Sequence, residues 1–451
     1  MRDGVIAELG DGLRLRHARA EDAEALAAFN GEVHGSPGQP SVSVAAWVRD
    51  LLSGEHPTVR PHDFTVVEEV SSGRIVSSLC LISQRLSYGG VELGAGQPEL
   101  VGTLPHFRRR GLIRRQMEEV HRWSAARGEL MTVISGIPWY YRQFGYEMAI
   151  HLGAQRVGWR RHVPRLAAGQ RESYRLRPAT ERDLGFISAL EHRRGQAQEL
   201  AVLRDEALWR HELGGHSPQS LARRELHVIE PDAAPEVGPV TPVGFLAHQP
   251  VGGLTIQVTA YELVPDAAWL AVTPSVLRFL VAQGEAWERA GRGGGEERRS
   301  AGYAFQLADD HPVYRAAPSA FPDRPRPWAA YARVPDLPRF LRHVAPALER
   351  RLRASPAAGY SGTLELSTYR EGIRLRFDHG RLLDVEPAPD LVWPKAQAYF
   401  PDLTFLNLVF GRVSLEELQT VLPDCVVRPE PARVLLEALF PKHGGHVWFV
   451  E

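Results

Sequence analysis

The 451-residue chain is 44% hydrophobic and 24% charged, a balance typical of a globular protein, and its length predicts two to four domains. Its 53 Lys and Arg against 54 Asp and Glu leave a net charge of -1, which excludes the broad basic field that sequence-independent nucleic-acid binding needs. Cys80 and Cys425 are too few for a disulfide framework or a cysteine zinc site. The N-terminus is acidic where a signal peptide is apolar, and no apolar run approaches membrane-spanning length. We therefore expect a cytoplasmic protein that binds neither nucleic acid nor membranes.

Two segments about 160 residues apart open alike. The sequence LRLRHARAEDAEALAAF at residues 13–29 is echoed by YRLRPATERDLGFISAL at residues 174–190. Each pattern predicts a short alternating strand, a polar turn and an amphipathic helix that begins with acidic residues. The echo predicts two copies of one α/β domain. Chance similarity of two amphipathic segments is the alternative.

Within the first copy, the order of predicted elements continues as a hairpin, a strand, a helix and a strand. Ser-Ser-Gly separates β-rich runs at residues 64–70 and 74–83, which predicts the hairpin. The helix is predicted to end at Gly128 and to precede a strand and an aromatic segment, PWYYRQFGY. The remaining ranges are a strand at 99–103, a helix at 112–126 and a strand at 129–135.

The rest of the chain differs in composition and in its predicted order of helices and strands. Pro- and Gly-rich stretches at residues 230–244 and 291–299 are predicted to be surface loops inside the second copy. From about Val334 the pattern predicts a helix over 335–352, a hairpin over 361–386 and then short helices, an α+β domain. The predicted domains are residues 1–160, 161–333 and 334–451.

An arginine-rich turn carries the clearest chemical signal. The strand at 99–103 leads directly into a helix through Arg108-Arg109-Arg110-Gly111-Leu112-Ile113. Unpaired N–H groups and the positive dipole end of a helix N-terminus suit a pyrophosphate. Gly111 permits close approach of a ligand to the backbone, and the arginines add charge-assisted contacts. A solvated basic helix start is the alternative.

The segment LVGTLPHFRRRGLIRR, residues 100–115, resembles the acetyl-CoA motif of the GNAT superfamily, a strand followed by Arg/Gln-x-x-Gly-x-Gly/Ala. Ile113 departs from the motif, which prefers Gly or Ala there. Arg-Arg-Arg-Gly-Leu before a large aliphatic residue is similar to the bacterial enhanced-intracellular-survival (Eis) branch. This resemblance covers nearly the whole chain. It implies an α/β and α+β protein, with two tandem GNAT-type domains followed by a sterol-carrier-protein-like α+β domain, assembled as a hexamer.

The same resemblance assigns the cofactor contacts. The backbone of strand 101–103 would bind the pantetheine arm of acetyl-CoA as an added strand, and the turn would wrap the pyrophosphate. Ordinary sheet and turn structure is the alternative. The implied cofactor-binding residues are Val101, Gly102, Thr103, Arg109, Arg110, Gly111, Leu112, Ile113, Arg114, Ser135 and Gly136.

Acetyl transfer to an amine needs a neutral nucleophile, a stabilised oxyanion and a proton for the departing thiolate. The segment WYYRQFGY resembles the family's Tyr-x-x-Phe-Gly-Tyr, and Tyr141 matches its proton-donating tyrosine. Tyr140 or Tyr146 as the residue facing the site, and simple core packing, are the alternatives.

The base is implied by the other end of the chain. In the Eis branch the terminal carboxylate serves as base, and this chain ends in HVWFVE, so Glu451 is the candidate. Many family members end instead in an aromatic residue, and a frayed terminus is the alternative. Glu32 is the next acidic candidate. Scattered histidines lack metal-ligand spacing, so no metal is expected.

The second and third predicted domains carry weaker signals. The stretch AAWLAVTPSVLRFLVAQGEAWER stands in the place of the cofactor motif but has no Arg-x-x-Gly turn, so the second copy is expected to bind no cofactor. Residues 402–418 resemble the sterol-carrier pattern, in which apolar helices line a lipid tunnel. Phe405, Leu408 and Phe410 are expected either there or, by physical default, in the core.

These signals together predict an enzyme. The expected activity is transfer of the acetyl group of acetyl-CoA, as co-substrate, to a primary amine of a small molecule, aminoglycoside-like or alkylamine, by direct attack in a ternary complex. A protein lysine acetyltransferase is one alternative. A lipid or small-ligand carrier without catalysis is the other.

Overall fold

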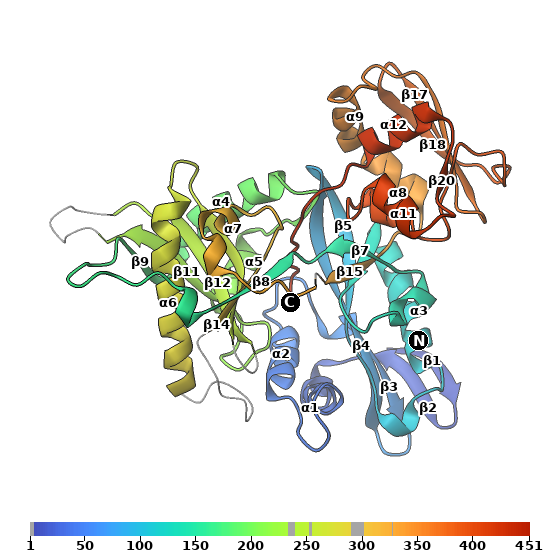
Figure 1. The fold of residues 1–451 in the computed structure, drawn as a ribbon. Coiled ribbons are helices and arrows are strands. Elements are labelled where there is room, and N and C mark those ends of the chain that lie inside the picture. The colour runs from blue at the N-terminus through green and yellow to red at the C-terminus, as the bar shows by residue number, and fades with distance from the viewer. Residues whose placement is uncertain (1–3, 233–239, 252–254, 290–301, 327) are drawn as a thin grey trace.

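The computed structural model describes residues 4–232, 240–251, 255–289, 302–326 and 328–451 (Figure 1). The predicted loop at 291–299, and residues 233–239 of the other predicted loop, lie outside the described residues. Over the described residues, the strands form three sheets that follow one another along the chain. In that part of the chain, every helix is too short or too polar to span a membrane.

The first sheet has nine strands among the described residues. In spatial order they are β1 (Val5–Gly10), β2 (Leu13–His17), β3 (Phe64–Glu69), β4 (Arg74–Tyr88), β5 (Val91–Thr103), β6 (Met131–Ile134), β15 (Ala329–Arg333) and β7 (Glu147–His151), with β10 (Leu200–Val202) paired to β4. Its helices are α1 (Ala23–Val33), α2 (Val42–Leu52) and α3 (Leu112–Ala126).

Helices cover both faces of this sheet, because alternate residues of a strand point to opposite sides. On β4, Leu79 and Leu81 pack with Met117 of α3. Cys80 of the same strand belongs instead to the main core, which includes Leu26 of α1. The strand β5, the helix α3 and the parallel strand β6 thus form one β-α-β unit.

The second sheet has the same plan. Its order is β8 (Ala154–Trp159), β14 (Gly302–Leu307), β13 (Thr255–Leu263), β12 (Gly244–Val251), β11 (Glu225–Pro231) and β9 (Tyr174–Pro178). Two short helices cover one face and one long helix covers the other (Figure 1). They are α4 (Leu184–Gln196), α5 (Glu206–Gly214) and α6 (Trp269–Arg289), and α7 (Pro312–Ala316) follows β14.

The two echoed sequence segments fold around matching ion pairs. In the first sheet, Arg16 donates to both oxygens of Asp22 at 2.7 and 2.9 Å and to Glu68 on the next strand at 2.7 Å. The corresponding residues of the second sheet are Arg177, Asp183 and Glu230. In both places the arginine ties the opening strand to the turn before the first helix and to a neighbouring strand.

The two sheets exchange strands near the expected domain boundaries. Strand β8, which ends at Trp159, lies in the second sheet and pairs with β14. Strand β15, at Ala329–Arg333, returns to the first sheet and inserts between β6 and β7. The boundaries at 160 and 333 follow the chain, but hydrogen bonds place each of these strands in the other sheet.

The third sheet belongs to the C-terminal part of the chain. Its order is β18 (Arg381–Pro387), β17 (Gly372–Asp378), β16 (Gly362–Ser367), β19 (Ala398–Tyr399) and β20 (Val426–Val427). Its helices are α8 (Leu337–His343), α9 (Ala345–Arg353), α10 (Leu406–Val409), α11 (Leu415–Val421) and α12 (Glu430–Leu439). Helix α10 of this part contacts the end of β4, where the Tyr88 hydroxyl donates to the Val409 carbonyl at 2.6 Å.

Two predictions for this region were wrong in detail. The single helix expected over 335–352 is broken at Val344, because Pro346 has no N–H to continue the first helix and instead begins α9. The hairpin expected over 361–386 is a three-stranded meander. Its second turn contains His379 and Gly380, both with positive φ (46° and 77°), which suits a tight hairpin turn.

Candidate active site

Strands β5 and β6 separate after a short stretch of pairing. They are paired in parallel at Ala95 with Met131 and at Gly96 with Thr132. Beyond these pairs a bulge interrupts β5, where the register against β4 shifts and Leu100 has a φ of 54°. Bulges bend a strand away from its neighbour. The C-terminal ends of the two strands therefore diverge and leave backbone unpaired between them.

A cavity of about 840 Å³ occupies this gap, within the range of small-molecule sites. Ten of the eleven predicted cofactor-binding residues line it, together with Tyr141. The ten are Val101, Gly102, Thr103, Arg109, Gly111, Leu112, Ile113, Arg114, Ser135 and Gly136. Arg110 is outside the lining, and its guanidinium lies 5.2 Å from the centre of the Phe107 ring.

One end of the cavity is the N-terminus of α3. Gly111 is the residue that caps this helix, and its left-handed conformation (φ 74°) suits glycine. No side chain caps the helix, so its first N–H groups face the cavity as an anion site. Over the described residues, no carboxylate pairs with Arg108 or Arg109, and Arg114 donates to the neutral Gln143 at 3.0 Å. Positive charge therefore collects here uncompensated.

The aromatic segment supplies the other end. Tyr141 lies in the 3₁₀ helix at Tyr140–Phe144, lines the cavity and is 4% exposed. Its ring packs against Gly136, where a Cβ would lie 2.9 Å from the ring. Burial and the nearby charge of Glu99 raise the pKa of Tyr141, which keeps its hydroxyl protonated at neutral pH.

The other tyrosines are placed differently. Tyr146 is fully buried, and its hydroxyl accepts a hydrogen bond from Thr132 and contacts His121, both at 2.8 Å. It is a core residue outside the cavity lining. Tyr140 lines the cavity and is half-buried. Of the two tyrosines weighed beside Tyr141, only Tyr140 lines the cavity. Tyr141 also packs in a hydrophobic cluster with Tyr146 and Tyr331, so its role as acid stays a prediction.

Sequence reasoning missed Glu99, which lies just before the bulge and lines the cavity. Burial, and secondarily the charge of Glu451, raise the pKa of Glu99 to about 7, although a hydrogen bond from Gln97 opposes the shift. A carboxylate with a pKa near the working pH is suited to general-base catalysis. The available signal was an acidic residue at the start of an otherwise apolar strand.

The C-terminal segment reaches the site by hydrogen bonds rather than by lining it. The Val450 N–H donates to Oε1 of Gln84 at 3.3 Å, and Gln84 Nε2 donates to Gln97 at 2.6 Å. Gln97 Nε2 in turn donates to Glu99 at 3.0 Å. This relay of amides connects the chain terminus to the buried carboxylate of the cavity. The segment from Val447 to Val450 is itself buried.

Glu451 lies beside this relay. Its side chain is 2.6 Å from the guanidinium of Arg224 in the second sheet's domain. Its backbone oxygen lies 3.4 Å from Nε2 of His56, whose Nδ1 accepts from the N–H groups of Thr58 and Val59. Nε2 of His56 therefore carries the proton and donates to Glu451. Glu32 is exposed and lies 3.6 Å from Arg74, outside the cavity lining.

The corresponding position of the second sheet has a different structure. Helix α6 begins at Trp269 without an arginine turn. Strands β13 and β14 pair over four consecutive residues, Thr255–Val258 with Gly302–Phe305, before β13 continues. The expectation that this copy binds no cofactor stays a prediction.

Comparison with known proteins agrees with this geometry. Residues 14–149 match the family described as acetyltransferase (GNAT) domain. No curated protein matches the sequence significantly. Many solved structures share the fold, with low sequence identity.

Three of these structures cover almost the whole chain. A probable N-acyltransferase of unknown function from Enterococcus faecalis has a TM-score of 0.65 at 14% identity, covering 97% of this chain and 100% of its own. A GCN5-related N-acetyltransferase from Anabaena variabilis has a TM-score of 0.62 at 13% identity, covering 97% and 99%. Eis1 from Mycobacterium abscessus has a TM-score of 0.56 at 16% identity, also covering 97% and 99%. Residues 14–149 thus match the family model of a GNAT acetyltransferase domain, in a chain whose fold resembles that of Eis1.

Proposed function

We propose that this protein transfers the acetyl group of acetyl-CoA to a primary amine of a small molecule. The observation that carries the proposal is a single cavity that joins the uncapped N-terminus of α3 to Tyr141 and Glu99. An anion site, an acid and a base are the three elements that this reaction needs. The match of residues 14–149 to the GNAT domain supports acyl transfer as the reaction class.

The residues that would hold acetyl-CoA, a co-substrate that supplies a thioester-bound acetyl group, follow from this arrangement. The N–H groups at the start of α3, with Arg109 and Arg114 beside them, suit a pyrophosphate. The edge of β5 at Val101–Thr103 pairs with β4 on one side, and the side that β6 leaves uncovered suits the amides of an extended arm. We expect one such site in each chain.

Glu99 and Tyr141 would each transfer one proton in the reaction. Glu99 accepts the proton that the amine loses as it attacks, because the carboxylate is largely ionised above pH 7. Tyr141 donates its proton to the departing thiolate, because its raised pKa keeps the hydroxyl protonated. Direct attack of the amine in a ternary complex requires no covalent intermediate on the protein.

Glu451 is the second proposed base. Its pairing with Arg224 and its contact with His56 hold it near Glu99, and two carboxylates together attract a cationic amine. Glu99 is the stronger candidate, since it lines the cavity and Glu451 does not. Glu99→Gln, described below, removes the first candidate, and Glu451→Gln removes the side-chain carboxylate of the second while keeping its terminal carboxylate. Extending the chain by a short Gly-Ser tail displaces that terminal carboxylate and should abolish turnover only if it is the base.

We further propose that the second sheet is a degenerate GNAT-type copy and that the third is sterol-carrier-protein-like. The matching ion pairs of Arg16 and Arg177 support the first idea. The whole-chain likeness to Eis1 supports both. A cytoplasmic homo-oligomer, a hexamer by the same resemblance, completes the proposal.

The carrier alternative has one observation in its favour. A cavity of about 680 Å³ in the C-terminal part is lined by residues that include Leu337, Ile373, Phe405 and Leu406. Leu408 and Phe410 are buried in the core instead. A carrier would take up lipid there and consume no acetyl-CoA.

A consumption assay tests the proposal. Purified protein is incubated with acetyl-CoA and with polyamines, aminoglycosides or lysine peptides, while release of free thiol is followed. Turnover with a small amine supports the proposal, and turnover confined to peptides favours a protein acetyltransferase. If acetyl-CoA neither binds in a calorimetric titration nor is consumed, the proposal fails.

A further inference from the structure

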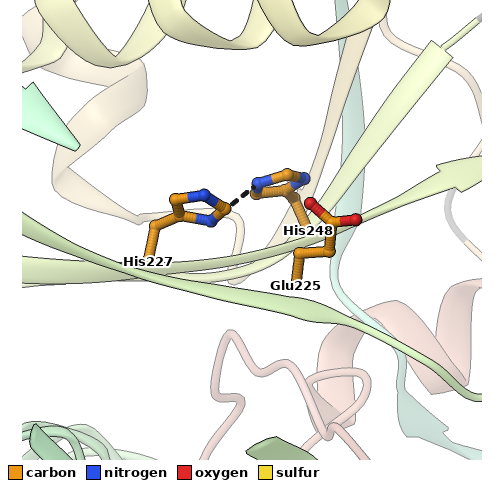
Figure 2. Close-up of side chains that lie close together, drawn as sticks. All are labelled: Glu225, His227 and His248. Atoms are coloured by element: carbon orange, nitrogen blue, oxygen red, sulfur yellow. Dashed lines mark hydrogen bonds between the residues drawn. The ribbon is translucent and has the colours of Figure 1, made fainter. Parts of the chain in front are cut away.

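A cluster of two histidines and a glutamate lies in the second sheet, apart from the cavity described above. Figure 2 shows Glu225, His227 and His248 together, with the two imidazoles facing each other. One ligand atom from each of the three lies within 4.8 Å of the others. All three come from adjacent strands, Glu225 and His227 from β11 and His248 from β12.

Strand register brings these side chains to one face. Glu225 pairs directly with His248 across the antiparallel ladder. His227 is two residues farther along β11, and residues two apart on a strand share a face. The cluster therefore depends on the sheet backbone rather than on loops, which keeps metal ligands in place.

The cluster is covered by α6. The ring of Phe279 lies 4.9 Å from that of His227 and 5.8 Å from that of His248, and the ring of Trp287 lies 5.5 Å from that of His248. The aromatic rings of α6 thus cover the two imidazoles, which are both buried.

The spacing of the imidazoles fits one shared ion. Nε2 of His248 and Nδ1 of His227 are 3.1 Å apart. Two nitrogens bound tetrahedrally to one zinc ion at about 2.0–2.1 Å lie about 3.3 Å from each other. The separation of the two nitrogens therefore suits one shared ion, which would replace the hydrogen bond between the rings.

We propose that Glu225, His227 and His248 bind a divalent transition-metal ion, with zinc the best match to two imidazoles and one carboxylate. Glu225 is partly exposed, so the ion enters from that side and water completes the coordination. The ion would cross-link β11 and β12 and so stabilise the second domain. The sequence did not reveal this site, because His227 and His248 are 21 residues apart on different strands.

Metal binding by a tag-free chain tests the proposal. After dialysis against a chelator, the protein is titrated with zinc against a chromophoric competitor, and with cobalt while the visible spectrum is recorded. We expect one ion per chain, a cobalt spectrum of four-coordinate type and a higher Tm with zinc. His227→Asn and His248→Asn should each weaken binding at least about 10-fold, as should the milder Glu225→Gln.

His311→Asn is the matched control. His311 is a buried histidine of the same domain and also lies beside a glutamate, Glu262, at 3.6 Å. It caps α7, a role that asparagine retains, so zinc affinity should stay unchanged. If the native chain binds no stoichiometric zinc, or if the three cluster variants bind it as tightly as the control, the proposal is wrong. Glu225→Gln keeps this test valid should a histidine variant fail to fold.

Discussion

Gln97 donates a hydrogen bond from Nε2 to the carboxylate of Glu99 at 3.0 Å. This bond lowers the pKa of Glu99, while burial and the charge of Glu451 raise it, and the outcome is a pKa of about 7. A base acts only when deprotonated. Turnover should therefore fall as the pH drops through about 7, the midpoint of the activity profile. A substitution of Gln97 or Glu451 should move this midpoint in a direction that follows from its effect on the pKa of Glu99.

Glu99→Gln removes the base itself. We expect kcat/KM at pH 8 to fall on the order of 100-fold and the acidic limb of the pH profile to disappear. Affinity for acetyl-CoA, measured by calorimetry, should change little. A profile that keeps its midpoint near pH 7 in this variant would assign the base to another group.

Gln97→Leu keeps the size of the side chain and removes the hydrogen bond to Glu99. Because that bond favours the ionised carboxylate, its loss raises the pKa of Glu99, and the activity midpoint should move to higher pH. The variant also leaves Nε2 of Gln84 without its acceptor, so Tm should fall slightly. If the midpoint does not move, ionisation of Glu99 does not control the rate of turnover.

Tyr141→Phe and Tyr146→Phe should have opposite effects. The first removes the proposed acid in the cavity and should lower kcat on the order of 100-fold with little change in Tm. The second removes a hydroxyl that contacts Thr132 and His121 in the core, so Tm should fall and kcat should persist. Loss of turnover in Tyr146→Phe but not in Tyr141→Phe would reverse the assignment.

Local signals predicted much of the first domain. The helix expected over 112–126 is α3 as predicted, because glycines with φ of 74° and 77° at Gly111 and Gly128 mark its two ends. The strand expected at 129–135 is β6, four residues long. Ten of the eleven residues that the family motif predicts to bind the cofactor line one cavity, although their binding role stays a prediction. In these cases, the residues that determine the structure are close in sequence to the element that they determine.

Features that depend on distant partners were not predictable. The placement of β15 between β6 and β7 is set by hydrogen bonds across about 180 to 200 residues of chain. The raised pKa of Glu99 and its place in the cavity follow from a bulge, from burial and from Glu451, none of which its sequence neighbours reveal. The relay from Val450 likewise exists only after folding.

Gly111→Asp tests the anion site at the start of α3. The added carboxylate would meet the positive end of the helix and repel a pyrophosphate, so acetyl-CoA affinity should fall at least about 10-fold. Gly128→Asp is the matched control. Gly128 has nearly the same φ, and a Cβ at either position meets no atom within 4 Å. It stands at the opposite end of α3, so it should alter Tm without affecting affinity. Equal losses of affinity in both variants would contradict the proposed site.

Glu451→Gln tests the coupling between the last residue and the cavity. The charge of Glu451 raises the pKa of Glu99, so its removal should lower that pKa and move the activity midpoint to lower pH, opposite to Gln97→Leu. Arg224, deprived of its partner at 2.6 Å, adds positive charge and acts in the same direction. Glu32→Gln is the control, because Glu32 is exposed and pairs with Arg74, and it should leave the midpoint in place. If Glu451→Gln instead abolishes turnover at every pH while Glu99→Gln remains active, Glu451 is the base and Glu99 only tunes its surroundings.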